Sequence, residues 1–444
     1  MNAPKAMIRA MLIVIPLSLS LAACAGSPPV EGSSPLLTAA EEQIRDYVEQ
    51  NKDEAVQLLQ RVADINSGTM NVDGVREVGR VFQSQLDELG FETRWISMPA
   101  TVGRAGHLFA ERSGDRGSRI LLIGHLDTVF ERDSTFQKSA RQRGRLKGPG
   151  VADMKGGDVV MLHALKALHH VGALEGTTIT VALIGDEEKP GRPIDVVRDD
   201  LIEAANRSDV ALGFEGGVGR NDATVARRGA GTWILEVTGK EGHSSRIFTP
   251  AFGDGAIFEA ARILNAFREE LSGEEYLTFN PGVILGGTSM DFDPETARGA
   301  AFGKPNVISQ KVTVQGGLRF ISEEQKKKAQ ARMREIVSQS LSGTSAEIHF
   351  HKDEYPAMTP NRGDYELLAA FDGVSRDLGL GAIEPVDPGS RGAADISFVA
   401  PLVDALAGLG PVGTGSHSIR EDLDLESLRI STQRAAVLLY RLTR

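Results

Sequence analysis

Three short apolar segments in the first half of the chain constrain its fold more than any other feature. They are Ile120–Gly124, Thr177–Gly185 and Val210–Phe214. Continuous apolar runs of this length are typical of strands that are buried on both faces of a sheet. A helical pattern over Asp158–Val171 lies between the first two segments. Strands that alternate with helices favour an α/β fold with a doubly wound, mostly parallel sheet.

Helical periodicity also runs through Leu37–Ile65 and Val75–Leu89, before the first of these strands. Gly90 follows the second pattern at the position of a helix C-cap, and Phe91–Ser97 then alternates like a strand. These segments belong with the same α/β domain.

A different pattern begins after residue 226. Its order is strand, helix, strand, strand, helix, strand, a split βαβ arrangement that is typical of a small independent unit. A helical pattern over Arg362–Gly379 follows, and the chain closes on another helix. We therefore predict an α/β domain, residues 37–226 and 356–444, that is interrupted by an α+β (β-α-β-β-α-β) domain, residues 227–355. The six elements of the insert are expected at Thr232–Thr238, Asp254–Phe267, Thr278–Gly286, Lys311–Ile321, Ser322–Leu341 and Ala346–Tyr355.

The first 36 residues have the pattern of a processing signal and a tether. A positively charged start precedes the apolar run Met11–Ala23, which is too short for a comfortable membrane span. The run leads into Cys24 through Leu-Ala-Ala, which resembles the bacterial lipoprotein box. We predict a lipoprotein signal peptide at residues 1–23, lipidation at Cys24 and an anchor and tether at residues 24–36. The alternative is an ordinary secretory signal followed by a chance cysteine.

Cys24 is the only cysteine, so an internal disulfide is impossible and zinc cannot be bound through sulfur in the mature domain. We expect an exported protein that is lipid-anchored to the bacterial cell envelope and faces the periplasm or the exterior. Its only contact with the membrane would be the N-terminal lipid. A net charge of -11 argues against nucleic-acid binding, which needs clustered Lys and Arg.

Polar residues follow the predicted strands at the points where the strands end. His125 and Asp127 follow the first strand, and in this spacing the acid can orient the imidazole toward a metal ion. Glu187 and Glu188 follow the second strand, and Glu215 follows the third. Because ligands bind at the carboxyl ends of strands in α/β sheets, we expect these side chains to lie close together.

Two further motifs lie in glycine-rich segments. Asp153 occurs within Gly148–Gly157, just before a helix, where glycines permit close approach of the backbone and one carboxylate can bridge two cations. His417 occurs within Gly415–Ser418. Each motif alone has a structural alternative, such as a strand-end histidine, an N-capping aspartate or a solvated acidic loop.

Together the motifs predict a site for two Zn²⁺ ions, with Co²⁺ or Mn²⁺ as replacements. Three carboxylates and one bridging hydroxide balance the four positive charges, so the cluster can be buried. Each ion would have one histidine, one terminal carboxylate, the shared aspartate and the hydroxide, which is a tetrahedral N/O set. The predicted ligands are His125, Asp153, Glu188, Glu215 and His417.

The order and context of these motifs resemble the M20 family of metallopeptidases, which includes carboxypeptidase G2-like enzymes, succinyl-diaminopimelate desuccinylase and aminoacylase. The resemblance covers nearly the whole mature chain. It implies that Asp127 orients His125 and that Glu187 is the general base. It also implies two zinc sites that share one aspartate: His125, Asp153 and Glu215 at one, and Asp153, Glu188 and His417 at the other.

The inserted domain then resembles the family's lid and dimerisation domain, which implies a homodimer. His243 lies in a stretch, Gly239–Ser245, that resembles the one whose histidine stabilises the oxyanion, and in this family that histidine can come from the partner subunit. Asn306 and Arg319 match the lid's substrate-binding pair, in which an arginine fork suits a substrate carboxylate.

The chain departs from the family pattern in ways that leave the predicted cage intact and the substrate open. Gly316 and Gly317 stand where an acid often precedes the Leu-Arg of the lid, and Lys189–Arg192 follows the two glutamates instead of a Gly-Ser pair. Arg391 begins the segment that matches the Gly-rich stretch before the last ligand. It either adds a second cation to the substrate pocket or pairs with a neighbouring acid.

The sequence therefore predicts a co-catalytic di-zinc hydrolase of amide or peptide bonds. Its substrates would be small peptides or N-acyl amino acids with a free carboxylate, as for a carboxypeptidase or a dipeptidase. An N-acyl amino acid deacylase would use the same chemistry with a different pocket. A non-catalytic lipoprotein that binds peptides or metal is the third alternative, and the spare Glu187 argues against it because a binding protein needs no base.

Overall fold

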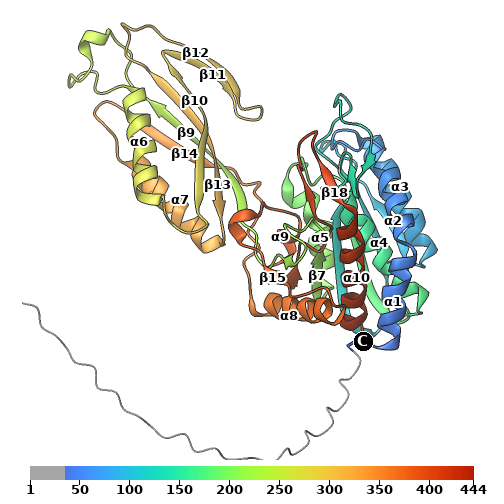
Figure 1. Cartoon of the computed structure of the whole chain (residues 1–444). Helices are drawn as coiled ribbons and strands as arrows, with labels where there is room; N and C mark the ends of the chain where they lie inside the picture. Colours follow the sequence, from blue (N-terminus) through green and yellow to red (C-terminus); the bar gives the residue numbers. More distant parts are fainter. Residues whose placement is uncertain (1–35) are drawn as a thin grey trace, which may run out of the picture. The chain divides into compact units, whose positions relative to one another are not determined.

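Six strands form the central sheet, in the order β1-β2-β6-β3-β7-β16. The four strands from β6 to β16 are parallel to one another, whereas β2 and β1 pair antiparallel at one edge. The computed structural model describes residues 36–444, and Leu37–Arg444 forms one compact unit (Figure 1). The strands are β1 (Glu92–Ile96), β2 (His107–Arg112), β3 (Arg116–His125), β6 (Thr177–Ile184), β7 (Val210–Gly213) and β16 (Asp404–Leu406).

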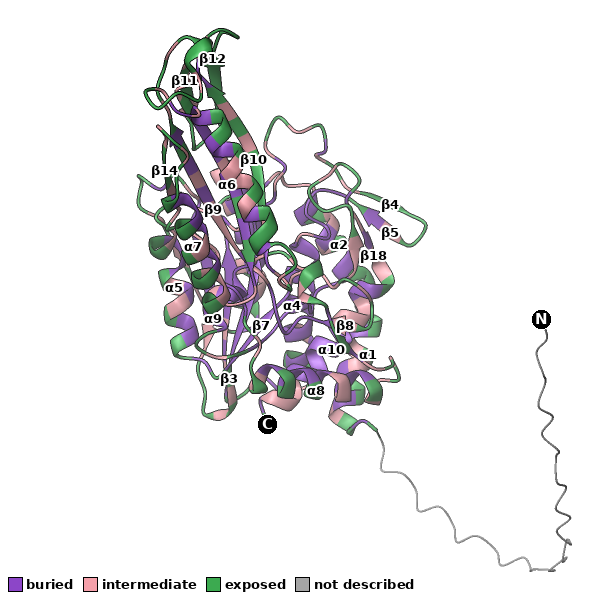
Figure 2. Ribbon diagram, turned by 90° about the vertical axis from the view of Figure 1, so that its left-hand side faces the viewer, coloured by how far each residue is buried: buried purple, intermediate pink, exposed green. Residues whose placement is uncertain are grey.

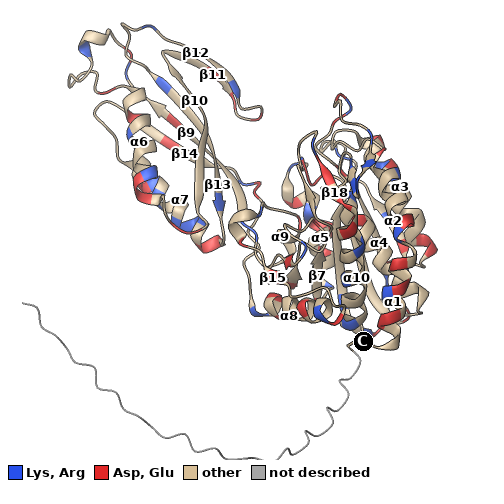
Figure 3. Ribbon diagram, viewed as in Figure 1, with Lys and Arg blue, Asp and Glu red and all other residues tan. Residues whose placement is uncertain are grey.

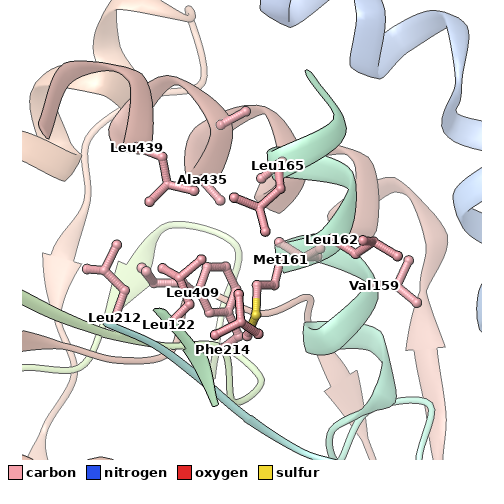
Figure 4. Packing of buried hydrophobic residues seen from close by; sticks show 14 of the residues in the cluster. Leu122, Val159, Met161, Leu162, Leu165, Leu212, Phe214, Leu409, Ala435 and Leu439 are labelled. Carbon is pink, nitrogen blue, oxygen red and sulfur yellow. The ribbon is translucent and has the colours of Figure 1, made fainter. Parts of the chain in front are cut away.

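Helices cover both faces of this sheet, because alternate side chains of β3 enter two different cores. Ile120 and Leu122 pack with α1 to α4, α8 and α10, and Leu121 and Ile123 pack with α5 and α9. Figure 4 shows the first core, where Leu122 of β3 lies near Met161 and other residues of α4. This confirms the predicted doubly wound α/β fold. The helices are α1 (Ala39–Gln50), α2 (Lys52–Ala63), α3 (Val72–Glu88), α4 (Lys155–His170), α5 (Ile194–Asn206), α8 (Arg362–Asp377), α9 (Ile396–Val399) and α10 (Leu425–Leu442).

The residues between β7 and α8 form a second sheet, in the order β10-β13-β9-β14, with a hydrophobic core of its own. That core contains only residues from Trp233 to Ala357, and it buries one face of α6 and of α7. The outer faces of these two helices are exposed (Figure 2). The elements are β9 (Gly229–Thr238), α6 (Ala256–Leu271), β10 (Thr278–Gly287), β13 (Lys311–Phe320), α7 (Glu323–Ser338) and β14 (Ser345–Phe350).

The structure adds β2 and α5, which the sequence analysis did not predict, and it departs from the predicted elements elsewhere as well. The helical pattern of Leu37–Ile65 is two helices, because Asn51 both ends α1 and begins α2. The insert contains an additional hairpin, β11 (Ser289–Asp293) and β12 (Arg298–Phe302), between β10 and β13. The predicted last strand of the insert, Ala346–Tyr355, already ends at Phe350.

Small sheets join loops that are far apart in the sequence. A four-stranded sheet in the order β17-β18-β5-β4 places residues 413–424 beside residues 140–147. This sheet brings the segment after β5 next to the loop between β17 and β18. Its strands are β4 (Ala140–Gln142), β5 (Arg145–Lys147), β17 (Gly413–Thr414) and β18 (Asp422–Asp424), and a further pair joins β8 (Asp222–Ala223) to β15 (Glu384–Pro385).

Acidic and basic residues are mixed along the outer helices, as Figure 3 shows for α1, α3 and α7. Within residues 36–444 no helix is both long and apolar enough to cross a membrane. The predicted signal peptide and Cys24 lie outside the described residues, so the lipoprotein assignment stays a prediction.

Candidate metal centre

The five predicted ligands lie together at the carboxyl end of the central sheet. The Asp153 carboxylate lies between the two histidines. Its Oδ1 is 3.3 Å from His125 Nε2 and its Oδ2 is 3.2 Å from His417 Nε2. Glu215 Oε1 is 3.6 Å from His125 Nε2, and Glu188 Oε2 is 3.1 Å from His417 Nε2. Each histidine therefore faces one carboxylate of its own and one oxygen of a shared carboxylate.

Two overlapping sets of donor atoms in this cluster lie close enough together to share a metal ion. The ligand atoms of His125, Asp153 and Glu188 lie within 4.8 Å of one another, and so do those of His125, Glu187 and Glu215. The cluster opens into a pocket of about 460 Å³ that also includes His417. The donors are nitrogen and carboxylate oxygen, which suits zinc and related divalent ions.

Each side chain reaches the cluster because a strand or a tight turn ends beside it. His125 is the last residue of β3, and Glu188 and Glu215 follow β6 and β7. Asp153 lies in the turn before α4, and His417 lies between β17 and β18. His417 has a left-handed backbone (φ 62°), and its side chain is 59% exposed. It is the most accessible member of the cluster.

Asp127 makes more contacts in the site than the single contact to His125 that the sequence predicts. His125 Nδ1 is 3.1 Å from the backbone oxygen of Asp127 and 3.5 Å from its carboxylate. The carboxylate itself accepts hydrogen bonds from the backbone N–H groups of Glu187 (3.0 Å) and Glu188 (3.1 Å). The Thr69 hydroxyl donates to it as well, at 2.6 Å. Asp127 therefore fixes both the imidazole and the turn that carries the two glutamates.

Glu421 is a buried acid that the sequence analysis did not single out. Its carboxylate accepts backbone N–H groups of Ala152 (2.8 Å), Asp153 (3.1 Å) and Gly150 (3.3 Å). Burial raises its pKa to about 7. Glu421 thereby fixes the turn that presents Asp153, from a position just after the His417 loop.

Asp186, the first of the three consecutive acids, points away from the cluster. Its carboxylate accepts from the fully buried Arg198 at 2.7 Å. Arg198 also donates to Asp395 (2.7 Å) and to the hydroxyl of Tyr355 (3.2 Å). The Tyr355 hydroxyl donates to the backbone oxygen of Glu187 at 3.0 Å. This buried network supports the Glu187 turn from behind.

The electrostatics of the cluster favour bound cations. Burial, together with Glu215 and other nearby acids, raises the pKa of Glu187 well above its usual range. Burial also raises the pKa of Glu188 to about 7. Hydrogen bonds to Asp153 and Glu188 raise the pKa of His417 to about 11. Acids that hold protons in this way are stabilised when a divalent ion replaces those protons.

One buried atom tests whether the residues fit a metal. Glu188 Oε1 is buried, and no group within residues 36–444 donates a hydrogen bond to it. An unpaired buried carboxylate oxygen is costly, and a metal ion would satisfy it. The residues of the cluster therefore fit the predicted pair of divalent cations.

The three predicted substrate-binding residues lie in the insert, and none of them lines the pocket of the cluster. His243 and Asn306 are joined, since the backbone N–H of Ser244 donates to the Asn306 carbonyl at 2.9 Å. Arg319 lies on β13 opposite Ala230. Partial desolvation and the neighbouring Arg228 lower the pKa of Arg319, although the residue keeps an exposed surface. Arg391, by contrast, does line the pocket.

A doubly wound sheet with an inserted α+β domain is also the architecture of solved structures of metal-dependent peptidases. The chain belongs to peptidase family M20/M25/M40, whose family model matches residues 121–441. This confirms the predicted family and its class of activity, an amide-bond hydrolase.

Known proteins of this family are similar to this chain over most of their length. Carboxypeptidase G2 from Pseudomonas sp. (strain RS-16) is 26% identical over 394 residues, which cover 87% of this chain and 89% of that protein. The structure of aminopeptidase PepT from Bacillus cereus matches with a TM-score of 0.69 at 18% identity, covering 89% of this chain and 99% of that one. A dinuclear metal binding peptidase of the M20 family from Bacillus subtilis matches with a TM-score of 0.62 at 15% identity, again covering 89% and 99%.

Proposed function

We propose that this chain hydrolyses the amide bonds of small peptides or N-acyl amino acids with a free carboxylate, and that two Zn²⁺ ions support the reaction. The observation that carries the proposal is the position of Asp153, whose two oxygens lie against two different histidines. One carboxylate shared in this way is what a pair of neighbouring cations requires.

His125, Asp153 and Glu215 would hold one ion, and Asp153, Glu188 and His417 would hold the other. When bound, two divalent ions polarise the scissile carbonyl and lower the pKa of a water molecule. Asp127 and Glu421 position the ligands through the contacts described above. The protein thereby keeps the two histidines and the shared carboxylate in a fixed geometry.

Glu187 is the acid of the cluster that this ligand set leaves over, and we assign it as the general base. Its Oε2 lies 4.0 Å from His125 Nε2, close to the ligands. Glu187 lines the pocket that opens onto the cluster, which is the position that a general base requires. Glu187 would take a proton from the attacking water and deliver it to the leaving nitrogen.

His243 is suited to donate a hydrogen bond to the developing oxyanion. The backbone N–H of Ser245 donates to His243 Nδ1 at 3.3 Å, so a neutral imidazole carries its proton on Nε2. Arg319 and Asn306 would hold the free carboxylate of the substrate. Because these residues do not line the pocket, the proposal includes either closure of the insert or a homodimer in which the partner subunit supplies the histidine.

The test is Glu187→Gln, which keeps the shape of the side chain and removes the base. Turnover of a dipeptide or an N-acyl amino acid should fall by about 10²- to 10⁴-fold. Metal content, measured by elemental analysis, should stay as in the wild type. Glu366→Gln is the matched control, since Glu366 is exposed and pairs only with Arg362. Near-normal turnover by Glu187→Gln would remove the role assigned to Glu187.

Rates on a panel of dipeptides and N-acyl amino acids separate a dipeptidase or carboxypeptidase from a deacylase, because only the pocket differs between them.

Export and lipid anchoring at Cys24 belong to the same proposal, and the sequence pattern of residues 1–24 is what supports them.

A further inference from the structure

A second cavity lies in the α/β domain, apart from the metal cluster. Its volume is about 530 Å³, and within residues 36–444 it shares no lining residue with the pocket of the cluster. Its wall is formed where α1 meets α2, by the hairpin of β4 and β5, and by the start of α10. Cavities of this size are typical of sites for small molecules.

The charge on this wall is opposite to that of the whole chain. The chain has a net charge of -11, yet cations outnumber acids around the cavity. The cationic residues are Lys52, Arg141, Arg143, Arg145, Arg220 and Arg429, and the acids are Asp53, Asp424 and Glu426. Much of the excess comes from the β4–β5 hairpin, because residues 134–152 contain Lys and Arg but neither Asp nor Glu.

Most of the other cations on the wall are already held by a neighbouring acid. The pairs are Arg220 with Asp424 at 2.9 Å, Arg429 with Glu426 at 3.2 Å, Arg145 with Asp422 at 2.7 Å, and Lys52 with Glu49. The excess positive charge therefore lies with the two remaining arginines of the hairpin.

These two arginines, Arg141 and Arg143, are exposed (Figure 2). Arg141 Nη1 is 3.9 Å from the Asp53 carboxylate, which is too far for a hydrogen bond. Arg143 lies in the turn of the hairpin with a left-handed backbone (φ 50°), and no acid within residues 36–444 lies at ion-pair distance from it. Both guanidinium groups are therefore free to bind an anion without giving up a strong partner.

The opposite character is found among the apolar residues that line the cavity. Val48, Val56 and Leu428 are 5%, 6% and 1% exposed. His163 lines the cavity beside them and is itself 3% exposed. Burial lowers the pKa of His163 to about 4, so its ring is uncharged at neutral pH. The cavity thus combines a cationic edge with an uncharged, largely apolar lining.

We propose that this cavity binds a small molecule with an anionic head, a phosphate or a carboxylate, and an apolar body. Arg141 and Arg143 bind the head through their guanidinium groups. The buried side chains around Val56 and Leu428 cover the body. The site goes beyond the proposed hydrolase function and does not depend on it, because none of these residues belongs to the metal cluster.

The experiment is calorimetric titration of the protein with ethyl, butyl and hexyl phosphate. We expect hexyl phosphate to bind with a Kd of about 1 mM or tighter. Binding should tighten along the series by up to about fourfold for each methylene that becomes buried. Inorganic phosphate supplies the head alone and hexanol the body alone, and each should bind more weakly than hexyl phosphate. Absence of hexyl phosphate binding, or a Kd that does not depend on chain length, would overturn the proposal.

The double variant Arg141→Gln/Arg143→Gln tests the assigned head site. Because both arginines are exposed, we expect it to weaken hexyl phosphate binding by about three- to tenfold. Arg268→Gln/Arg362→Gln is the matched control, since it changes the net charge equally at side chains that are 69% and 92% exposed elsewhere. Equal Kd values for the two double variants would also overturn the proposal.

Two other sources of binding are separated by further titrations. Phosphate can bind to metal ions, so hexyl phosphate is titrated into folded Asp153→Asn as well, and the Kd should stay as in the wild type. Loss of binding there would place the ligand at the cluster and overturn the proposal. Binding to phosphatidylglycerol vesicles without binding to hexyl phosphate would assign the hairpin to a membrane surface, which also overturns it. Failure of turnover leaves each of these results unchanged, so the two proposals are tested separately.

Discussion

The cluster region and the insert present their functional residues in opposite ways. In the cluster region, residues as distant in sequence as His125 and His417 face the same carboxylate at 3.3 and 3.2 Å. In the insert, the two segments that carry His243 and Asn306 are joined by backbone hydrogen bonds, and Arg319 lies on a separate strand. The first region is assembled within one chain, whereas the three residues of the insert do not line the pocket of the cluster.

The contrast follows from what holds the side chains. Asp127 and Glu421 are buried acids that accept backbone N–H groups and so fix the turns on which the ligands lie. Asn306 and Arg319 are exposed and have no comparable support. Metal ligands bind cations more tightly when they are already held in place, because moving carboxylates on binding lowers the affinity for the metal. Residues that grip a substrate can remain apart until it arrives.

The largest expected effect is that of Asp153→Asn, since it removes the carboxylate that, within residues 36–444, is shared by the two histidines. We expect both cations to be lost rather than one. Turnover should fall by about 10³-fold or more, because most of the rate acceleration by the enzyme, typically about 10⁶-fold or greater, would depend on the two cations. Elemental analysis after dialysis provides the measurement.

Asp209→Asn is the control for that experiment, because Asp209 pairs with Arg119 on the surface. Retention of two tightly held ions by Asp153→Asn would show that Asp153 does not bridge them. The contrast between the cluster region and the insert would then lose its main support.

A smaller effect is expected in the insert. His243→Ala should lower kcat by about 10²- to 10³-fold, which is the usual cost of one oxyanion donor, and should leave metal content unchanged. His349→Ala is the control, since His349 lies in the same domain and is exposed beside Glu236. Equal kcat values for the two variants would remove the role of His243.

Mixing two inactive variants then shows which subunit supplies the histidine. A mixed dimer of His243→Ala and Glu187→Gln regains activity only if His243 completes the site of its partner. Absence of recovery in a verified mixed dimer would favour closure within one chain. Either result sharpens the comparison of the two regions.

The sequence could predict the fold and the cluster because both leave local patterns. Buried strands such as Ile120–Gly124 are visible as apolar runs, and strand ends in such sheets converge on one edge. Residues such as Arg198 and Glu421 leave no such pattern. Their partners lie elsewhere in the chain, at Asp395 and at the turn that carries Asp153, so only the folded structure connects them.

The hairpin of β11 and β12 was also not predicted, although the sequence contains a turn signal for it. Its turn, Asp293–Thr296, contains Asp-Pro, and the Asp293 carboxylate accepts hydrogen bonds from Glu295 and Thr296. The flanking strands are short and largely exposed, so their hydrophobic pattern is weak. The position of Arg391 in the pocket wall could not be decided from the sequence, because it depends on how distant segments fold together.

Tyr355 connects the two regions, and its effect should be the smallest of the series. It follows the last strand of the insert, yet its hydroxyl donates to the backbone oxygen of Glu187 and accepts from Arg198. Tyr355→Phe keeps the ring that packs against Phe398 and removes only the hydroxyl. Losing one such hydrogen bond should lower kcat by about three- to tenfold.

KM and metal content should stay unchanged in this variant, because the hydroxyl contacts no side chain of a predicted ligand and Tyr355 itself does not line the pocket. Tyr365→Phe, on the exposed side of α8, is the control. A rise in KM without a fall in kcat would mean that Tyr355 acts on the placement of the insert and not on Glu187. A fall in kcat alone would mean that the insert already supports the base through this one contact before any substrate binds.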